Sequence, residues 1–411
     1  MIRAITPVAA LLFGTAILLT GQGLQGTLLP VRATLEDFST ISIGLMGTAY
    51  FLGFTYGCWK GSELIRRVGH VRVFAAMTAI ASATPLLHGL WLNPWLWSSL
   101  RFVSGFCFAV LYLVIESWLN ERSTNDNRGT VFSAYILINM TVLGVGQQML
   151  LFYDPLNLNL FALASVLVSL AAVPVVLSKS ETPRAIEETK LDLRGLYKNS
   201  PVGMLGSMSC GLTNGSFWTL APVFSVAYSD DISLTANFMT AVVLGGAIGQ
   251  WPLGWLSDRI DRRVVLSGIS LAGVIIAAIL WLLASELSTN SIIALATVWG
   301  GLAFPVYSIS VAHANDRTEP GSFVMVSAGL LLMYGIGAII GPFIASTMMG
   351  VGDPGYLFLF TLIVHLLLAL YVFARSILRT QASEIDHTSF GDALASTQTK
   401  SQIYEDELER E

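Results

Sequence analysis

Long apolar runs recur along nearly the whole chain, separated by short stretches in which charged residues gather. Each run is close to the roughly 20 residues that a helix needs to cross a bilayer. The runs do not alternate apolar with polar residues as barrel strands do. The pattern therefore predicts an all-α polytopic membrane protein. We predict twelve membrane helices, over residues 5–29, 41–62, 73–92, 97–118, 130–152, 156–177, 203–227, 235–256, 264–284, 291–312, 323–348 and 356–375.

Basic residues divide unevenly between the two sets of connecting segments. If the N-terminus is cytoplasmic, all 22 lysines and arginines except Arg32 and Arg101 fall on the cytoplasmic side. Basic residues are enriched in cytoplasmic segments of membrane proteins. We therefore predict that both termini are cytoplasmic and that the protein spans the cytoplasmic membrane. The first apolar run is longer than that of a signal peptide and no cleavage site follows it, so we expect this helix to be retained.

The longest predicted cytoplasmic segment lies between the sixth and seventh spans and carries charges of both signs. It divides the chain into two halves of six helices. The end of the chain is acidic and poor in aromatic residues, which is typical of a disordered segment, although a docking tail is an alternative. The predicted organisation is an N-terminal bundle, a linker, a C-terminal bundle and an acidic tail, over residues 1–177, 178–202, 203–376 and 377–411.

Composition narrows the class of protein further. Charged residues make up 12% of the chain, about half their share in a soluble domain. The three cysteines lie inside apolar runs without metal-ligand spacing, and there is no phosphate-binding loop that would indicate ATP as the energy source. No paired carboxylates or catalytic triad indicate an enzyme. We expect a monomer in the lipid bilayer, with no cofactor, no metal and no nucleic-acid partner.

An internal repeat relates the two halves. The segment TGQGLQGTLLPV (20–31) aligns with TNGSFWTLAPV (213–223) at one constant offset, and the same offset places Arg67 on Arg259. A slightly larger offset places Tyr112 on Tyr307. The first, second, fourth and fifth spans thus match the seventh, eighth, tenth and eleventh in the same orientation. This parallel duplication is typical of transporter halves related by an axis along the membrane normal.

The segment GWLSDRIDRR (254–263) resembles the loop motif of the major facilitator superfamily, roughly Gly-x-Leu-x-Asp-Arg-x-Gly-Arg-Arg. Asp261 stands where the family usually has glycine, and in the N-terminal copy Arg66 stands where aspartate is expected. The stretches RFVSGFCFAVLYLVIESWL (101–119), NRG (127–129), GQWPLGWLSD (249–258) and GIGAIIGP (335–342) are similar to the YcaD-like branch, whose substrates are largely unassigned. The resemblance covers all twelve spans but not the acidic tail.

The resemblance implies two bundles that rock about a central site, with a cytoplasmic gate at the charged loops. Asp258 can face the positive end of a neighbouring helix, and Arg259 can pair with a carboxylate at a helix end. Arg262 and Arg263 have an alternative role as topology anchors. The predicted gate residues are Asp258, Arg259, Arg262, Arg263, Arg66, Arg67, Glu116 and Arg128, the last two as partners of Arg66 and Arg67.

Charged residues inside membrane spans are costly and often functional. Glu116 is either a gate partner or a protonatable coupling group. Arg101 begins an Arg-x-x-x-Gly pattern with Gly105, which in some members of the superfamily is linked to proton coupling; alternatively it extends to the outer surface. Lys60 and Glu63 complete the coupling candidates, and their alternative is a local ion pair.

Uncharged polar and aromatic residues on the spans are the candidates for the substrate cavity, which the first and seventh spans line in this superfamily. They are Gln22, Gln25, Asn139, Gln147, Asn214, Trp218, Gln250, Trp251, Tyr307 and Tyr334. Each has an alternative role as an interhelical hydrogen bond or a packing ring. Since the sequence marks no isolated deep cation or carboxylate, we expect a neutral or amphipathic cargo.

Three functions are compatible with these patterns. The first is a secondary active transporter of a small organic solute, coupled to protons. The second is a drug or metabolite exporter of the same fold, which the absence of a Gly-Pro motif from the fifth span disfavours. The third is a non-transporting sensor or assembly factor that acts through the acidic tail. Deleting residues 380–411 distinguishes the third function, since a transporter should keep its flux without the tail.

Overall fold

The computed structural model describes residues 8–123, 128–177, 192–229, 231–318 and 323–378, and the regular structure in these ranges is helical. The first half of the chain forms α2 (Ala9–Leu35), α3 (Thr40–Val68), α4 (His70–Leu90), α5 (Pro94–Arg122), α6 (Arg128–Gln148), the short 3₁₀ helix η2 (Met149–Phe152), α7 (Asn159–Leu170) and α8 (Ala172–Val176). The second half forms α9 (Leu193–Asn199), α10 (Pro201–Tyr228), α11 (Ile232–Ser257), α12 (Arg262–Leu283), α13 (Thr289–Ala303), α14 (Pro305–Asn315), α15 (Phe323–Val351) and α16 (Tyr356–Leu378).

Each predicted span corresponds to one long helix or to two consecutive shorter ones. The sixth span is α7 followed by α8, and the tenth is α13 followed by α14, which starts at Pro305. Eleven spans are apolar and long enough to cross a membrane by length and composition alone. The remaining one, α10, is a 28-residue helix that carries several polar residues. Helices α3 and α5 extend beyond the predicted ranges 41–62 and 97–118, because the helical conformation continues into the polar residues that follow each apolar run.

Local residues fix where several helices begin. The side chains of Ser39, Asn93, Asp231 and Ser288 accept hydrogen bonds from backbone N–H groups in the first turns of α3, α5, α11 and α13. Such caps satisfy donors that have no partner within the helix. Helix α3 ends at Val68, and the next residue, Gly69, has a φ of 94°, a conformation that glycine adopts at little cost. The chain therefore turns directly from α3 into α4.

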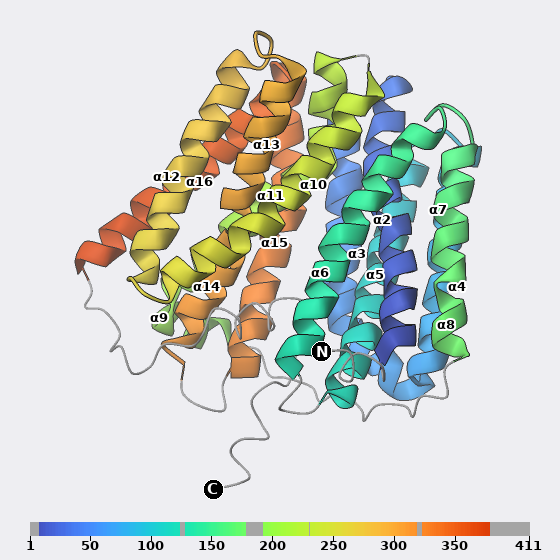
Figure 1. The fold of residues 1–411 in the computed structure, drawn as a ribbon, viewed down its shortest axis with the longest axis horizontal. Coiled ribbons are helices and arrows are strands. Elements are labelled where there is room, and N and C mark those ends of the chain that lie inside the picture. The colour runs from blue at the N-terminus through green and yellow to red at the C-terminus, as the bar shows by residue number, and fades with distance from the viewer. Residues whose placement is uncertain (1–7, 124–127, 178–191, 230, 319–322, 379–411) are drawn as a thin grey trace, which may run out of the picture.

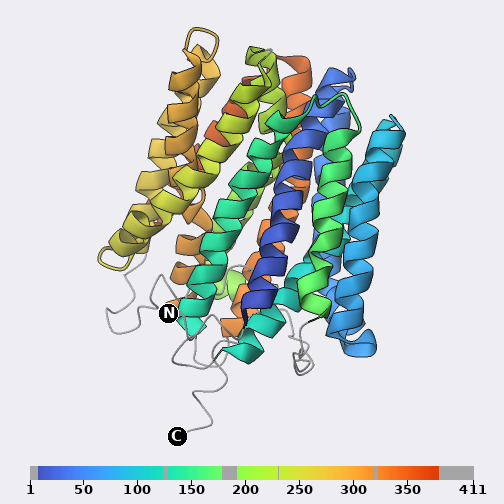
Figure 2. The ribbon, with the colours of Figure 1, turned by 45° about the vertical axis from the view of Figure 1, so that its right-hand side comes forward.

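The helices form two bundles that stand side by side, α2–α8 and α10–α16 (Figure 1). The internal arrangement of the two is the same. Helix α3 packs on α5 as α11 packs on α13, α2 on α6 as α10 on α15, and α4 on α7 as α12 on α16. The rotated view shows the long helices of both bundles running in the same general direction across the molecule (Figure 2). The structure is thus the two-bundle fold that the internal repeat predicts.

Glycine contacts reproduce the repeat residue by residue. A Cβ atom at Gly53 or Gly105 would collide with the backbone of the partner helix in the α3–α5 pair. Gly245 and Gly300 are in the same situation between α11 and α13. The offsets that align the two halves carry Gly53 onto Gly245 and Gly105 onto Gly300. The duplicated sequence therefore encodes the same close approach of helix backbones in both bundles.

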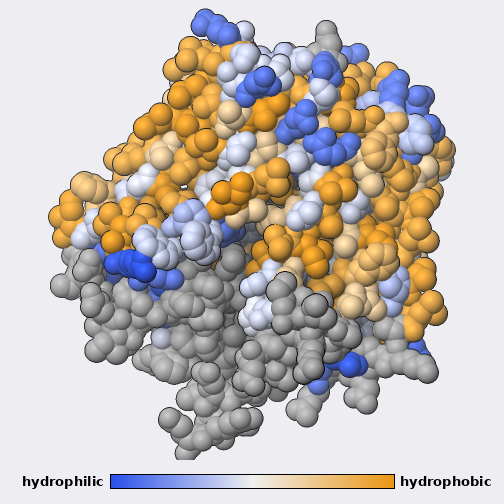
Figure 3. All heavy atoms as spheres, in the orientation of Figure 1, coloured by the Kyte–Doolittle hydropathy of each residue, from blue (hydrophilic) through white to orange (hydrophobic). Residues whose placement is uncertain are grey.

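Large apolar side chains cover the outside of the bundles (Figure 3). Phe13, Ile275, Leu367 and Ile377 are each at least 58% exposed. A soluble monomer rarely exposes so much contiguous apolar surface, whereas a bilayer solvates it. The protein is a multi-pass membrane protein.

The two ends of the bundles differ in charge. We call the basic side the end where α3 finishes with Arg66 and Arg67 and where the α11–α12 junction carries Arg262 and Arg263. The other end, where α3 begins at Thr40, is the opposite side.

The two bundles contact each other toward the opposite side. Thr48 Oγ1 donates a hydrogen bond of 2.8 Å to the Ile339 carbonyl, which joins α3 to α15. Gln148 Nε2 donates to the Ala236 carbonyl at 3.2 Å and to Thr240 Oγ1 at 2.9 Å, which joins α6 to α11. These hydrogen bonds hold the two bundles together on the opposite side.

Candidate functional site

A cavity of about 790 Å³ lies between the two bundles. Its volume is within the range of small-molecule binding sites, about 300–1,000 Å³. Helices α2, α3, α5 and α6 line it from one bundle, and α10, α11, α14 and α15 line it from the other. Nine of the ten residues predicted for a substrate cavity line it: Gln22, Gln25, Asn139, Gln147, Asn214, Trp218, Gln250, Tyr307 and Tyr334.

Trp251 is the tenth predicted residue, and its side chain does not line the cavity. It is 78% exposed on the outside of α11. Consecutive residues of an α-helix point about 100° apart, so the turn that directs Gln250 into the cavity directs Trp251 toward lipid. Trp251 was predicted from its residue type, and residue type alone does not say which face of the helix a side chain occupies.

Gln22 connects two tyrosines at the centre of the first bundle. Its Nε2 donates to the Tyr50 hydroxyl at 2.9 Å, and its Oε1 accepts from the Tyr112 hydroxyl at 2.9 Å. Both tyrosines line the cavity. Two hydrogen bonds from separate helices thus fix the orientation of the Gln22 amide and of both rings.

Other amides leave an oxygen available. The side-chain carbonyl oxygens of Gln25, Gln147 and Asn214 are buried and have no hydrogen-bond partner among the described residues. Leaving a buried acceptor unsatisfied costs about 1–3 kcal/mol. A bound molecule with hydroxyl or N–H groups would relieve this cost, which is consistent with a binding role for these residues.

Aromatic rings form much of the cavity wall. Tyr307 and Tyr334 lie edge to face with centroids 5.3 Å apart, and Trp218 and Phe304 lie 5.9 Å apart. In the first bundle, the rings of Phe54 and Tyr112 pack against each other with centroids 6.1 Å apart. Rings on both sides offer apolar and stacking contacts to a molecule between them.

Several lining residues were absent from the sequence prediction, among them Tyr50, Trp59, Tyr112 and Phe304. Tyr112 could have been found, because the repeat aligns it with Tyr307, a predicted cavity residue. Tyr50 had no such indication: the repeat aligns it with Val242, which lies in the α11–α13 contact.

Arg101 extends into the protein. Its guanidinium carbon lies 4.1 Å from the centroid of the Tyr50 ring, and its side chain lines the cavity. Arg101 therefore does not extend to the outer surface, which was the alternative for this residue. A cation held over an aromatic face is attracted by the ring's negative face.

Lys60 and Glu63 form a local ion pair, which was the alternative to their role in proton coupling. Lys60 Nζ lies 3.2 Å from Glu63 Oε2, and Glu63 also pairs with Arg67 on the next turn of α3. The side chains of Lys60 and Glu63 are 41% and 29% exposed, and neither lines the cavity. Arg67 was predicted to pair with Glu116, and the pair with Glu63 replaces that contact because Glu63 lies one turn away on the same helix.

Glu116 lies on α5 one turn from Tyr112 and is only 5% exposed. Its Oε1 accepts a hydrogen bond of 3.3 Å from the Tyr135 hydroxyl of α6. The side chain of Arg128, which was predicted with Glu116 as a partner of Arg66 and Arg67, lies outside the described residues. Glu116 is thus a buried carboxyl group that lies between Tyr135 and Tyr112, of which Tyr112 lines the cavity.

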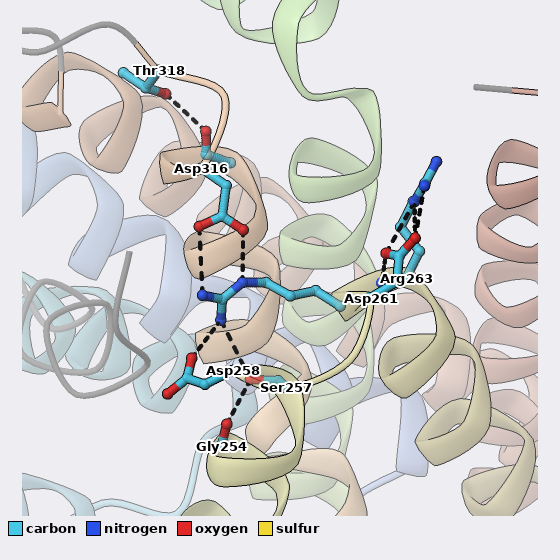
Figure 4. Close-up of polar contacts among 9 residues, drawn as sticks. Gly254, Ser257, Asp258, Asp261, Arg263, Asp316 and Thr318 are labelled. Carbon is cyan, nitrogen blue, oxygen red and sulfur yellow. Dashed lines mark hydrogen bonds and ion pairs between the residues drawn. The ribbon is translucent and has the colours of Figure 1, made fainter. Parts of the chain in front are cut away.

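The α11–α12 junction forms a buried charge cluster on the basic side (Figure 4). Arg262 Nε donates to Asp316 Oδ2 at 2.7 Å, and Arg262 Nη1 lies 3.2 Å from Asp258 Oδ1. The side chains of Arg262 and Asp316 are 1% and 4% exposed. Arg263 pairs with Asp261 at 2.7 Å and donates to the Arg375 carbonyl at the end of α16. The cluster therefore ties together α11, α12, α14 and α16.

These contacts differ from the predicted ones in detail. Arg259 was expected to pair with a carboxylate, but its guanidinium lies 3.7 Å from the centroid of the Trp255 ring. Asp258 was expected to face a helix end, and it pairs with Arg262. The carboxylate partner that completes the cluster, Asp316, was not among the predicted site residues. Arg66, in the N-terminal copy, lies exposed near the end of α3.

Comparison with known proteins gives the family. The model of the Major Facilitator Superfamily matches residues 203–405. An uncharacterized MFS-type transporter, YcaD of Escherichia fergusonii, is 27% identical over 346 residues, which cover 84% of this chain and 89% of that protein. The chain belongs to the major facilitator superfamily. Membership in this superfamily indicates a transporter of small-molecule solutes rather than an enzyme.

Solved structures of the superfamily share the fold. The nucleoside transporter NupG superposes with a TM-score of 0.76 at 14% identity, covering 91% of this chain and 99% of that one. A bacterial homolog of the human lysosomal transporter Spinster, in an inward-facing and occupied conformation, gives a TM-score of 0.74 at 14% identity, with coverages of 93% and 98%. At this identity the likeness establishes the two-bundle fold and does not identify a cargo.

Proposed function

We propose that this protein is a secondary active transporter that moves a small organic solute across the cytoplasmic membrane by alternating access, coupled to protons. The observation that carries the proposal is the cavity between two equivalent bundles, with polar and aromatic residues from both bundles in its wall. A site shared by two rigid halves changes its accessibility when the halves rock against each other. We propose these two bundles as the domains of the protein, over residues 1–177 and 203–376.

The proposed orientation places the basic side and both termini in the cytoplasm, since basic residues are retained there. The hydrogen bonds of Thr48 and Gln148 then lie toward the outer side. Trp59, Ala328 and Leu331 line the cavity in the halves of α3 and α15 nearer the basic side. These positions support a conformation that is closed to the outside and open to the cytoplasm.

A ligand screen tests the proposal directly. The purified protein in detergent is melted with metabolites and drugs at two pH values, because a ligand that binds the folded state raises the melting temperature. Compounds that raise it are then tested for uptake into proteoliposomes with and without a pH gradient. Accumulation that depends on the gradient supports proton-coupled transport. Binding without any flux would favour a sensor.

Glu116 is the proposed proton-coupling group. It is buried beside Tyr135 and Tyr112, where a change in exposure during rocking can bind or release a proton. Glu116→Gln keeps the shape and removes the titration. We expect substrate binding and exchange to persist. Accumulation driven by a pH gradient should fall at least about tenfold, because a positioned proton-transfer group usually contributes more than this factor to a rate. Glu63→Gln is the matched control on a partly exposed carboxylate outside the cavity, and an equal loss in both variants would contradict the assignment.

Asp258 is the proposed gate residue whose removal should slow cycling without removing binding. Its carboxylate pairs with Arg262, which keeps its second partner Asp316 when Asp258 is lost. The fold should therefore tolerate Asp258→Ala. We expect transport to fall by about five- to tenfold, the effect of about 1–1.4 kcal/mol on a conformational equilibrium. Equilibrium binding should remain unchanged in the melting assay, and lost binding with normal cycling would disprove the role.

A further inference from the structure

The cavity has one charged side chain. Among the described residues that line it, the uncharged polar groups are amides, hydroxyls, indole N–H groups and a thiol, and Arg101 alone carries a formal charge. No described carboxylate forms an ion pair with Arg101, and its guanidinium carbon lies 4.1 Å from the centroid of the Tyr50 ring. A guanidinium offers five N–H donors, and stacking over a ring occupies none of them.

Tyr50 provides a second donor at the same place. Its hydroxyl oxygen accepts the hydrogen bond from Gln22 Nε2, which leaves the hydroxyl's own hydrogen to be donated elsewhere. The Gln22 amide is itself held by Tyr112, so the Tyr50 hydroxyl is fixed in position. Arg101 and Tyr50 thus present unused donors to one region of the cavity, with the positive charge uncompensated by a described carboxylate.

We infer that Arg101 and the Tyr50 hydroxyl bind the single anionic group of an amphipathic organic anion, most simply a carboxylate. Charge-assisted hydrogen bonds from a guanidinium to a carboxylate are among the strongest in proteins. The rings of Trp218, Tyr307 and Tyr334 then contact the apolar part of the same molecule from the other bundle. This inference rests on the proposed function, and it names the class of cargo.

The same walls argue against a cationic cargo. Aromatic rings attract cations, but Arg101 already lies over the Tyr50 ring and its charge repels a second cation. No acidic side chain among the described lining residues compensates for that repulsion. The sequence favoured a neutral cargo because nothing in it placed Arg101 inside the cavity. With the side chain directed inward, the cavity is a positively charged site with apolar walls.

A matched set of three probes tests the charge preference. Phenylbutyrate, phenylbutyramide and phenylbutylamine share one apolar body and differ in charge at pH 7. Calorimetric titration and thermal shift of the full-length protein in detergent should show binding in the order carboxylate, then amide, then amine. Arg101→Gln should weaken carboxylate binding by about 10- to 100-fold, the range for a lost charge-assisted hydrogen bond, and leave amide binding unchanged.

Three further variants make the test specific. Arg101→Lys should keep part of the preference because it keeps the charge, and Tyr50→Phe should weaken carboxylate binding by a smaller factor because it keeps the ring under Arg101. Arg72→Gln removes a positive charge from an exposed position outside the cavity and should change nothing. An unchanged melting temperature and a single elution peak for each variant without ligand exclude loss of the fold.

The outcomes separate this inference from the proposed function. Equal binding of all three probes, preference for the amine, or no binding of phenylbutyrate by the folded wild-type protein would overturn the anion site. None of these outcomes would contradict transport of another cargo. Conversely, a carboxylate preference that depends on Arg101, found in a protein that gives no flux in proteoliposomes, would support the anion site and refute transport.

Discussion

Asp316→Ala is expected to lower the free energy of unfolding by about 3–5 kcal/mol, the usual cost of removing one partner from a buried ion pair. Asp316 accepts hydrogen bonds from Arg262 Nε and Nη2, at 2.7 and 3.4 Å. Without it the buried guanidinium retains Asp258, at 3.2 Å, and the Ser257 hydroxyl, to which Arg262 Nη1 donates at 3.3 Å. Since Asp258 is 37% exposed, it compensates only in part. Chemical denaturation and melting in detergent measure the loss.

The N-terminal bundle supplies a control for this effect. Glu63→Ala removes the carboxylate that pairs with Lys60 and Arg67 near the basic end of α3. Those side chains are exposed, so solvent screens the pair and the loss should be far smaller. A double substitution, Asp316→Ala with Arg262→Met, should recover much of the stability because it removes the stranded charge. Equal losses in Asp316→Ala and Glu63→Ala would show that burial does not strengthen the cluster.

Gly300→Leu is expected to prevent normal packing of α13 on α11. Even a Cβ at this position would collide with the Val242 carbonyl. This carbonyl is part of a helix backbone and cannot rotate away as a side chain can. Overpacking costs about 1–3 kcal/mol where side chains can adjust, and a backbone neighbour adjusts less. We expect a large fall in the yield of monodisperse protein after detergent extraction and in its melting temperature.

Gly268→Leu is the matched control. Gly268 lies exposed on α12 with open space around its Cα, so the same change should leave yield and melting temperature unchanged. Gly105→Leu, the repeat equivalent of Gly300, should behave like Gly300→Leu. If Gly105→Leu folds normally, the two bundles do not depend on equivalent backbone contacts.

The sequence predicted the architecture well because the bilayer imposes strong constraints. Apolar runs of the right length gave the twelve helices, and the repeat gave two equivalent bundles. The inward face of each helix was harder to predict. Gln250 and Trp251 are adjacent in sequence, yet Gln250 lines the cavity and Trp251 lies exposed on another face of α11. Apolar runs alone do not identify a helix face when both faces contact apolar surroundings.

Charged residues showed the same limit. The motif identified Arg262 and Asp258, but Asp316 lies 54 residues from Arg262 and joins it only through the packing of α14 beside α12. For Arg101 the sequence left open a coupling role or an extension to the outer surface. The Tyr50 ring that contacts it belongs to another helix. Partners brought together by tertiary packing have no fixed spacing along the chain, so sequence patterns identify one member and not the pair.

The polar composition of α10 bears on how the protein enters the membrane. Thr213, Asn214, Ser216 and Thr219 are buried within the folded protein, but a newly synthesised α10 would expose them to lipid. Polar residues reduce the partitioning of a single helix from the translocon into the bilayer. Helix α15, which packs closely on α10, is made more than a hundred residues later and covers part of this surface. Stable insertion of α10 should therefore await synthesis of α15, so the buried polar residues of this helix are expected to make membrane integration of the second bundle a cooperative late step.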